Sequence, residues 1–222
     1  IAYLPLPPEE NPALGLRGIR TSLWRPELLD IQLRALLRVR PAVRILLPMI
    51  TDVAEFEIVA HRLEVLCREL DVPRPQLGAM IETPAAAMLS DQIAGVADFL
   101  SIGTNDLAQY GLAMDRGHAE LAARIDGVHP AVLRLIEATT RGASTRGKPV
   151  AVCGGLASDP QAVPLLLGLG VVELSVVPGQ IPRLKALIRT LTLDRCRELA
   201  RRALVLTTAA EVRALVSNEV GK

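Results

Sequence analysis

The sequence is poor in several residue types, and each shortage excludes a class of protein. Only 2% of the 222 residues are aromatic, so Leu, Val, Ile and Ala must fill the interior. Basic and acidic residues nearly balance, at 25 against 24, which argues against a surface that binds nucleic acid or another polyanion. No apolar run reaches the roughly 18 residues that span a bilayer, and no secretory signal opens the chain. We therefore predict neither nucleic-acid binding nor membrane insertion.

Cysteine and lysine are also scarce. The three cysteines, Cys67, Cys153 and Cys196, lie far apart and form no C-x-x-C pair, so we expect neither a disulfide framework nor a thiolate metal site. Reduced thiols favour a cytoplasmic location. Only three of the 25 basic residues are lysines, which leaves 22 arginines. Arginine favours bidentate recognition of phosphate or carboxylate groups.

Half of the residues are hydrophobic, and the length suits one domain with a substantial core. No linker divides the chain, so we predict that residues 1–222 form one domain. The first residue is Ile1 rather than Met, so we expect the chain to be part of a longer protein.

Short apolar segments alternate with helical ones. Predicted strands cover residues 43–49, 77–82, 98–103, 149–153 and 171–177. Predicted helices cover residues 22–39, 52–70, 130–146, 159–167, 181–191 and 194–216, and two more begin at Pro84 and Asn105. Residues 1–16 are rich in proline and predicted to be an extended loop. Strands that are apolar on both faces and are each followed by a helix predict a parallel α/β sheet covered on both faces.

Residues with reactive side chains follow three of the predicted strands: Glu82, the pair Asn105 and Asp106, and Cys153. Ligands of α/β sheets and barrels bind at the carboxyl ends of strands. Glu82 and Asp106 are two hard oxygen ligands suited to Mg²⁺. The alternative is that both carboxylates only cap helices. No G-x-G-x-x-G follows a strand, which argues against a dinucleotide site.

Three arginines beside glycines, Arg17, Arg20 and Arg116, are candidate anion ligands, although any one of them is more often a solvated surface residue. Cys153 precedes two glycines and is a candidate proton donor or nucleophile. The alternative is a buried cysteine that acts as a small apolar side chain, as we expect for Cys67 and Cys196. Tyr110 is assigned to core packing, and the three histidines to structural or solvated positions.

Several segments together resemble a known family. They are ENPALGLRGIR (10–20), LLPMI (46–50), GAMIETPAAA (78–87), DFLSIGTNDLAQY (98–110), MDRG (114–117) and VCGGLASDP (152–160). Over essentially the whole chain they are similar to the C-terminal, phosphoenolpyruvate-binding domain of enzyme I of the phosphoenolpyruvate:sugar phosphotransferase system. The forms CGGLASDP and LSVVPG most resemble the enzyme I module of multiphosphoryl transfer proteins of the fructose type.

The resemblance implies a (β/α)8 TIM barrel of the phosphoenolpyruvate/pyruvate type. Only about five strands are visible where a closed barrel has eight, so we expect a partial, N-terminally truncated barrel without its phosphohistidine domain. The family binds phosphoenolpyruvate with Mg²⁺ and passes the phosphoryl group to a histidine on another domain, releasing pyruvate. The phosphoryl group then goes to an HPr-type carrier for sugar uptake. A homodimer formed through the barrel is also implied.

Residue by residue, the resemblance assigns Arg17 and Arg116 to phosphate binding and Glu82 and Asp106 to the metal. Asn105 and Asp106 contact the substrate, and Cys153 is the acid that protonates the enolate of pyruvate. Gly155 stands where free-standing enzyme I commonly has Glu. We therefore expect an enzyme domain, a phosphoenolpyruvate-protein phosphotransferase, that is incomplete for turnover when isolated. The alternatives are a non-catalytic dimerisation or regulatory fragment, or a relative of pyruvate phosphate dikinase or phosphoenolpyruvate synthase.

Overall fold

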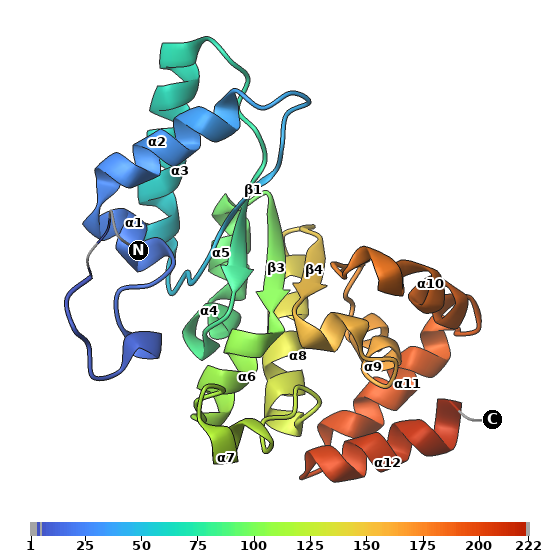
Figure 1. The fold of residues 1–222 in the computed structure, drawn as a ribbon. Coiled ribbons are helices and arrows are strands. Elements are labelled where there is room, and N and C mark those ends of the chain that lie inside the picture. The colour runs from blue at the N-terminus through green and yellow to red at the C-terminus, as the bar shows by residue number, and fades with distance from the viewer. Residues whose placement is uncertain (1–3, 5, 221–222) are drawn as a thin grey trace.

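A computed structural model describes residue 4 and residues 6–220, in which strands and helices alternate (Figure 1). The strands are β1 (Ile45–Leu47), β2 (Leu77–Ile81), β3 (Phe99–Gly103), β4 (Val150–Cys153) and β5 (Glu173–Leu174). The α-helices are α1 (Ile19–Trp24), α2 (Pro26–Leu37), α3 (Val53–Leu70), α4 (Pro84–Met88), α5 (Ser90–Val96), α6 (Thr104–Leu112), α7 (Ala119–Ala122), α8 (Pro130–Ser144), α9 (Val163–Gly168), α10 (Ile181–Arg189), α11 (Leu193–Leu204) and α12 (Ala209–Val220). Short 3-10 helices lie at Pro12–Leu14, Gly155–Ser158 and Pro178–Gln180.

The five strands form one parallel sheet whose spatial order, β1-β2-β3-β4-β5, is the order along the chain. A doubly wound sheet would reverse its order at a switch point, whereas sequential order is the rule in a barrel. The predicted α/β class and the five predicted strands are confirmed. Among the described residues the sheet is open, with β1 and β5 at its edges.

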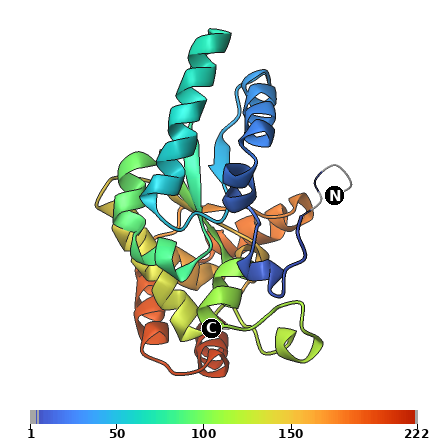
Figure 2. The ribbon, with the colours of Figure 1, turned by 90° about the vertical axis from the view of Figure 1, so that its left-hand side faces the viewer.

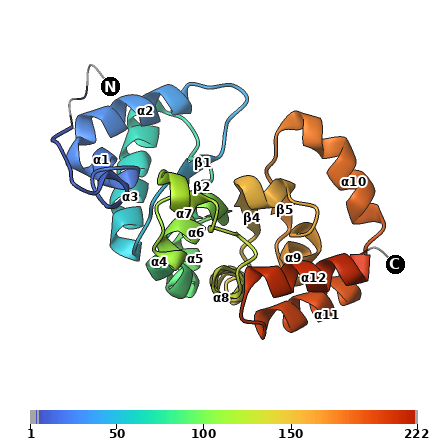
Figure 3. The ribbon, with the colours of Figure 1, turned by 60° about the horizontal axis from the view of Figure 1, so that its bottom comes forward.

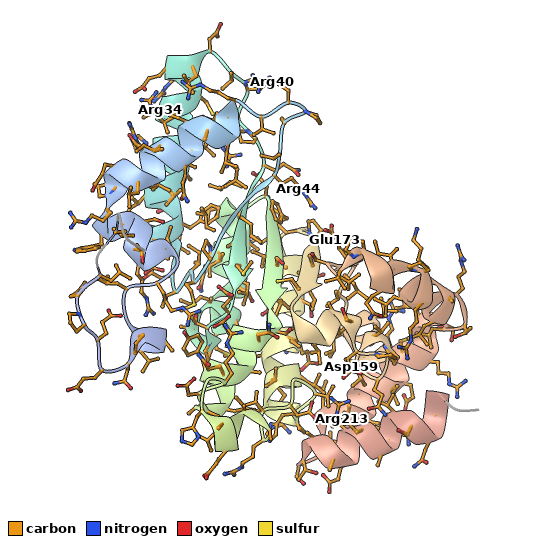
Figure 4. All side chains as sticks on the ribbon, in the orientation of Figure 1. Arg34, Arg40, Arg44, Asp159, Glu173 and Arg213 are labelled. Carbon is orange, nitrogen blue, oxygen red and sulfur yellow. The ribbon has the colours of Figure 1, made fainter. Side chains whose placement is uncertain are left out.

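An ion pair across the sheet shows that it curves as a barrel wall does. Arg44, which precedes β1, places Nη2 3.1 and 3.3 Å from the two carboxylate oxygens of Glu173 in β5 (Figure 4). In a flat sheet these outer strands would be four spacings of about 4.8 Å apart. The curvature brings their amino ends within reach of one another. Figure 3 shows helices α1–α3 and α9–α12 on opposite flanks of the strands.

The helix boundaries differ from the predicted ones where the chain carries a stop signal. The predicted helix 22–39 is two helices, because Arg25 leaves helical geometry and Pro26 opens α2. The helix expected from Pro84 also divides, at Leu89, and the C-terminal helix divides into α11 and α12. The predicted cap of α3 is confirmed: Asp52 Oδ1 accepts a hydrogen bond from Glu55 N at 3.0 Å.

The core lies between the sheet and the helices that cover its outer face. Helix α3 contributes Phe56 and Leu63, α8 contributes Ile136, and all three side chains are inaccessible to solvent. Figure 2 shows α3 extending beyond the strands alongside α2, to which it is joined by an ion pair between Asp30 and Arg62. No helix in the described part of the chain is long and apolar enough to cross a membrane.

Candidate active site

Glu82 stands directly after β2, and its side chain is held by the neighbouring strand ends. Its Oε2 accepts a hydrogen bond from the backbone N–H of Met49 at 2.8 Å, and the residue is only 7% exposed. A methyl group at Gly103 would lie 2.6 Å from Cγ and Oε1 of Glu82, so glycine at the end of β3 makes room for the carboxylate. Burial raises the pKa of Glu82 against the opposing hydrogen bond from Met49, and the nearby charge of Asp106 raises it further.

Asp106 lies in the first turn of α6 and receives two arginines from separate segments. Arg17 places Nη2 3.2 Å from Oδ1, and Arg116 places Nη2 3.3 Å from Oδ1 and 3.2 Å from Oδ2. The Asp106 side chain is 12% exposed, while those of Arg17 and Arg116 are 32% and 44% exposed. Arg17 and Arg116, two of the predicted anion ligands, therefore both contact Asp106, a predicted metal ligand. Their guanidinium groups are accessible to solvent.

Arg20, the third candidate anion ligand, does not join this cluster. Its Nη1 donates to the backbone carbonyls of Leu14 and Gly15, at 2.8 and 3.4 Å. The guanidinium of Arg20 thus closes the loop that precedes Arg17, and the structure gives it a local structural role.

Asn105 joins the carboxyl end of β3 to the loop after β4. Its Oδ1 accepts a hydrogen bond from Gly155 N at 3.0 Å, and Thr104 Oγ1 donates to the carbonyl of Cys153 at 2.7 Å. Gly154 has φ +88°, and a methyl group there would lie 2.7 Å from Thr104 Oγ1, so this close approach requires glycine. The loop after Cys153 is therefore fixed against the start of α6.

Cys153 ends β4 and is half-buried at the same rim. Its Sγ lies 3.5 Å from the carbonyl of Ile102, to which it donates, and 3.9 Å from Ser101 Oγ, from which it accepts. Burial raises the pKa of the thiol, the Ser101 hydrogen bond opposes this, and the charges of Glu82 and Asp106 add to the increase. A raised pKa keeps the proton on sulfur at neutral pH, which favours a proton donor over a thiolate nucleophile. Cys67 and Cys196 are buried in helices as predicted.

Two polar contacts made by α6 were not predicted from the sequence. Tyr110 packs against the core as predicted, and in addition its hydroxyl donates to the carbonyl of Ala13 and accepts from Arg17 Nη1 at 3.3 Å. Gln109 Oε1 accepts from Arg116 N at 3.0 Å. A signal was available, because residues three and four positions after Asp106 share its helix face.

The residues at this rim fit a divalent cation that is shared with a ligand. No group of three His, Cys, Asp or Glu side chains gathers as a metal site in the described residues, so the chain offers no complete cage. Mg²⁺ is commonly held by one or two carboxylates together with water and substrate oxygens. Glu82 and Asp106 supply such a pair, and a cation would compensate the burial of Glu82.

One cavity opens beside Arg17 and Arg116, and a second lies between Asn105 and the ion pairs of Arg213. The first, of about 530 Å³, is bordered by Arg17, Gln109 and Arg116. The second, of about 320 Å³, is bordered by Asn105 and Gly155. A small anionic ligand therefore has access to the guanidinium groups from the surface.

Residues 1–193 match the model of a family described as PEP-utilising enzyme, PEP-binding domain. This chain belongs to that family. It is 50% identical to a multiphosphoryl transfer protein of Xanthomonas campestris pv. campestris over 100% of this chain and 27% of the relative. It is 48% identical to a multiphosphoryl transfer protein of Rhodobacter capsulatus, over 97% of this chain and 26% of the relative.

The phosphoenolpyruvate-protein phosphotransferase of Buchnera aphidicola subsp. Acyrthosiphon pisum is 40% identical, over 99% of this chain and 40% of the relative. The higher identity to multiphosphoryl transfer proteins confirms the resemblance inferred from CGGLASDP and LSVVPG. The chain spans about a quarter to two fifths of the length of these relatives.

The solved structure of a citrate lyase from Burkholderia xenovorans LB400 is similar in fold. It superposes with a TM-score of 0.60 at 20% sequence identity, and the match covers 92% of this chain and 71% of that one. At this identity the likeness concerns the fold alone, and it agrees with a barrel-like arrangement of the parallel sheet.

Proposed function

We propose that this chain is the phosphoenolpyruvate-binding module of a phosphoenolpyruvate-protein phosphotransferase in a sugar phosphotransferase system. The observation that carries the proposal is the meeting of Arg17 and Arg116 at Asp106, beside Glu82 and on the same rim as Cys153. Family membership and the relatives named above support the same activity.

The proposed roles follow from charge and position. Arg17 and Arg116 bind the phosphate, and Asn105 and Asp106 orient the substrate beside it. Guanidinium groups neutralise the charge that develops on the equatorial oxygens during phosphoryl transfer. Glu82 and Asp106 would hold Mg²⁺, which when bound supplies further neutralisation of the same oxygens.

Cys153 completes the proposed chemistry. When the bond between phosphorus and the enol oxygen breaks, its electron pair stays on that oxygen and the phosphoryl group bonds to a histidine nitrogen of another domain. The resulting enolate takes a proton from the Cys153 thiol at its methylene carbon, which yields pyruvate. The thiolate then regains a proton from solvent.

The proposed partners complete the system. The acceptor is a phosphohistidine domain, which passes the group to an HPr-type carrier in the cytoplasm, and the module forms a homodimer. These partners are proposed from the family resemblance and from the names of the relatives.

Titration calorimetry of phosphoenolpyruvate into this chain tests the proposal. We expect heat that depends on Mg²⁺ and is lost in excess EDTA. The variant Arg17→Ala should lose most of this binding, whereas Arg20→Ala, three residues along in α1 and bonded to backbone carbonyls, should keep it. A chain that is folded by circular dichroism and gives no heat would contradict the proposal and favour a non-catalytic module.

A further inference from the structure

Three residues on one face of α6 contact the two arginines of the candidate site. Asp106, Gln109 and Tyr110 are spaced three and four positions apart, which places them on neighbouring positions of the helix surface. Asp106 receives both arginines, Tyr110 contacts Arg17, and Gln109 contacts Arg116. Resting on the proposed function, we infer that Tyr110 and Gln109 are positioning residues that hold the two arginines in place for a phosphate.

Tyr110 connects α6 with the segment that carries Arg17. Its hydroxyl donates to the Ala13 carbonyl, which orients the hydroxyl and leaves its oxygen lone pairs for Arg17 Nη1 at 3.3 Å. The segment has little regular structure of its own beyond Pro12–Leu14. Glu9 closes it locally by accepting from Leu16 N at 2.8 Å. The hydroxyl therefore fixes both the backbone before Arg17 and the guanidinium itself.

Gln109 acts on Arg116 through the backbone. The residue is 5% exposed, and its Oε1 accepts from Arg116 N at 3.0 Å. Helix α6 ends at Leu112, the following residue Ala113 has φ +53°, and Met114 N donates to the Gln109 carbonyl at 3.0 Å. The side chain and carbonyl of one residue thus fix the start of the loop that carries Arg116.

A fixed guanidinium binds an anion more tightly than a mobile one, because the cost of ordering the long side chain is met on folding rather than on binding. The two arginines have partly exposed side chains on separate loops, where this cost is greatest. The amide and the phenol need not touch the substrate, since each acts through its arginine.

A double-mutant cycle on this chain tests the role of Tyr110. By calorimetry with phosphoenolpyruvate and Mg²⁺, Tyr110→Phe should weaken binding about five- to tenfold, and it should have no further effect in an Arg17→Ala background. Thr140→Val, which removes a hydroxyl bonded to the Glu137 carbonyl in α8, is the matched control and should leave binding unchanged. An equal loss from Tyr110→Phe in both backgrounds, or no loss in wild type, would overturn the inference.

A second cycle treats Gln109 in the same way. Gln109→Met removes the acceptor at nearly constant size and should weaken binding, whereas Gln109→Glu keeps an acceptor oxygen and should restore part of it. The effect of Gln109→Met should vanish in an Arg116→Ala background. A loss that persists in that background would show a merely structural role and contradict the inference for Gln109.

Hydrogen–deuterium exchange without ligand separates this inference from the proposed function. Tyr110→Phe should speed amide exchange in residues 14–18 and leave α8 unchanged, and Gln109→Met should do so in residues 114–118. If wild type fails to bind phosphoenolpyruvate, the proposed function is wrong. Faster amide exchange in the two variants would still support the positioning roles of Tyr110 and Gln109. Unchanged exchange in both variants would overturn the inference whatever the binding result.

Discussion

Two of the clusters of arginine and carboxylate in the described part of the chain are built differently. In the candidate site, two arginines share one carboxylate: Arg17 and Arg116 approach Asp106 at 3.2 to 3.3 Å. Each contact is at the long end of the hydrogen-bond range. Two guanidinium groups therefore contact this one carboxylate.

The second cluster ties α12 to two loops, and acceptors are in excess there. Arg213 donates to Asp126 at 2.6 and 2.8 Å, to Asp159 at 3.0 Å and to Gln161 at 2.7 Å. Figure 4 labels Arg213 and Asp159 of this cluster. Nε and both Nη atoms of this guanidinium are engaged. The loops that it joins precede α8 and α9.

Stoichiometry and bond length distinguish the clusters, whereas the exposed fractions of Arg17 and Arg213 do not. The side chains of Arg17 and Arg213 are 32% and 34% exposed. The Arg213 guanidinium makes four hydrogen bonds of 2.6 to 3.0 Å, so most of its five N–H groups are engaged within the fold. Two guanidinium groups on a single acid retain capacity for an incoming anion. We expect the first cluster to control ligand binding and the second to control stability.

The largest expected effect is on turnover, and it distinguishes the proposed proton donor from the arginines proposed to bind the phosphate. In the longer protein that we propose to join this chain to a phosphohistidine domain, Cys153→Ala should reduce turnover about 10²- to 10⁴-fold, because the enolate loses its proposed proton donor. Phosphoenolpyruvate affinity should change less than twofold. Steady-state kinetics and calorimetry check this, with Cys67→Ala in α3 as the control cysteine. Equal losses of turnover and affinity would contradict the proton-donor role.

The next effect should fall on binding alone. Arg116→Ala should weaken phosphoenolpyruvate binding by about 2–4 kcal/mol, because a charge-assisted contact to the phosphate is lost. The free energy of unfolding should change by less than about 1 kcal/mol, since the pair with Asp106 is partly exposed. Calorimetry and urea denaturation measure the two quantities on the same sample. Unchanged affinity would reject the assignment of Arg116.

Arg213→Ala should give the opposite pattern. Removal of the guanidinium leaves Asp126 and Asp159 close together without their common donor, and we expect a loss of about 2–3 kcal/mol in the free energy of unfolding. Phosphoenolpyruvate affinity should change less than threefold. Arg197→Ala, at an exposed pair with Asp194, is the control and should change stability by less than about 0.5 kcal/mol. A larger effect on binding than on stability would contradict the structural role of Arg213.

The smallest expected effect is a pH dependence of the second cluster. Burial alone would raise the pKa of Asp126, but hydrogen bonds from Arg213 and Val128 N hold it below the ordinary value. Its contribution to stability is therefore complete above the unfolded pKa of about 3.9 and is lost as pH falls through the lower folded pKa. Urea denaturation between pH 2.5 and 6 should show a shallower loss of stability in Asp126→Asn than in wild type. Parallel pH curves would contradict this account of Asp126.

Much of the site was predictable because of one geometric rule. Glu82, Asp106 and Cys153 follow neighbouring parallel strands, whose carboxyl ends share an edge, so their approach follows from the strand prediction itself. Arg17 and Arg116 were found through the family resemblance, because local sequence made Arg20 an equally good candidate. The structure excludes Arg20 from the cluster since its guanidinium is bonded to nearby carbonyls.

The parts that were missed depend on contacts between distant segments. Tyr110 fits the apolar face of its helix, and only the tertiary fold of the chain brings Ala13 and Arg17 to its hydroxyl. Arg213 meets Asp126 from 87 residues away, a distance at which periodicity and capping carry no signal. The division of the first helix was predictable from Pro26, which local rules place at a helix start.

The central claim is that Glu82 and Asp106 hold one ion together with phosphoenolpyruvate, next to Cys153. Crystals of this chain grown with phosphoenolpyruvate and Mn²⁺, in place of Mg²⁺, test it through the anomalous scattering of the metal. The account predicts one anomalous peak in contact with carboxylate oxygens of both Glu82 and Asp106, with the phosphate between Arg17 and Arg116. A peak elsewhere, or a ligand whose methylene carbon lies on the side away from Cys153, would contradict it.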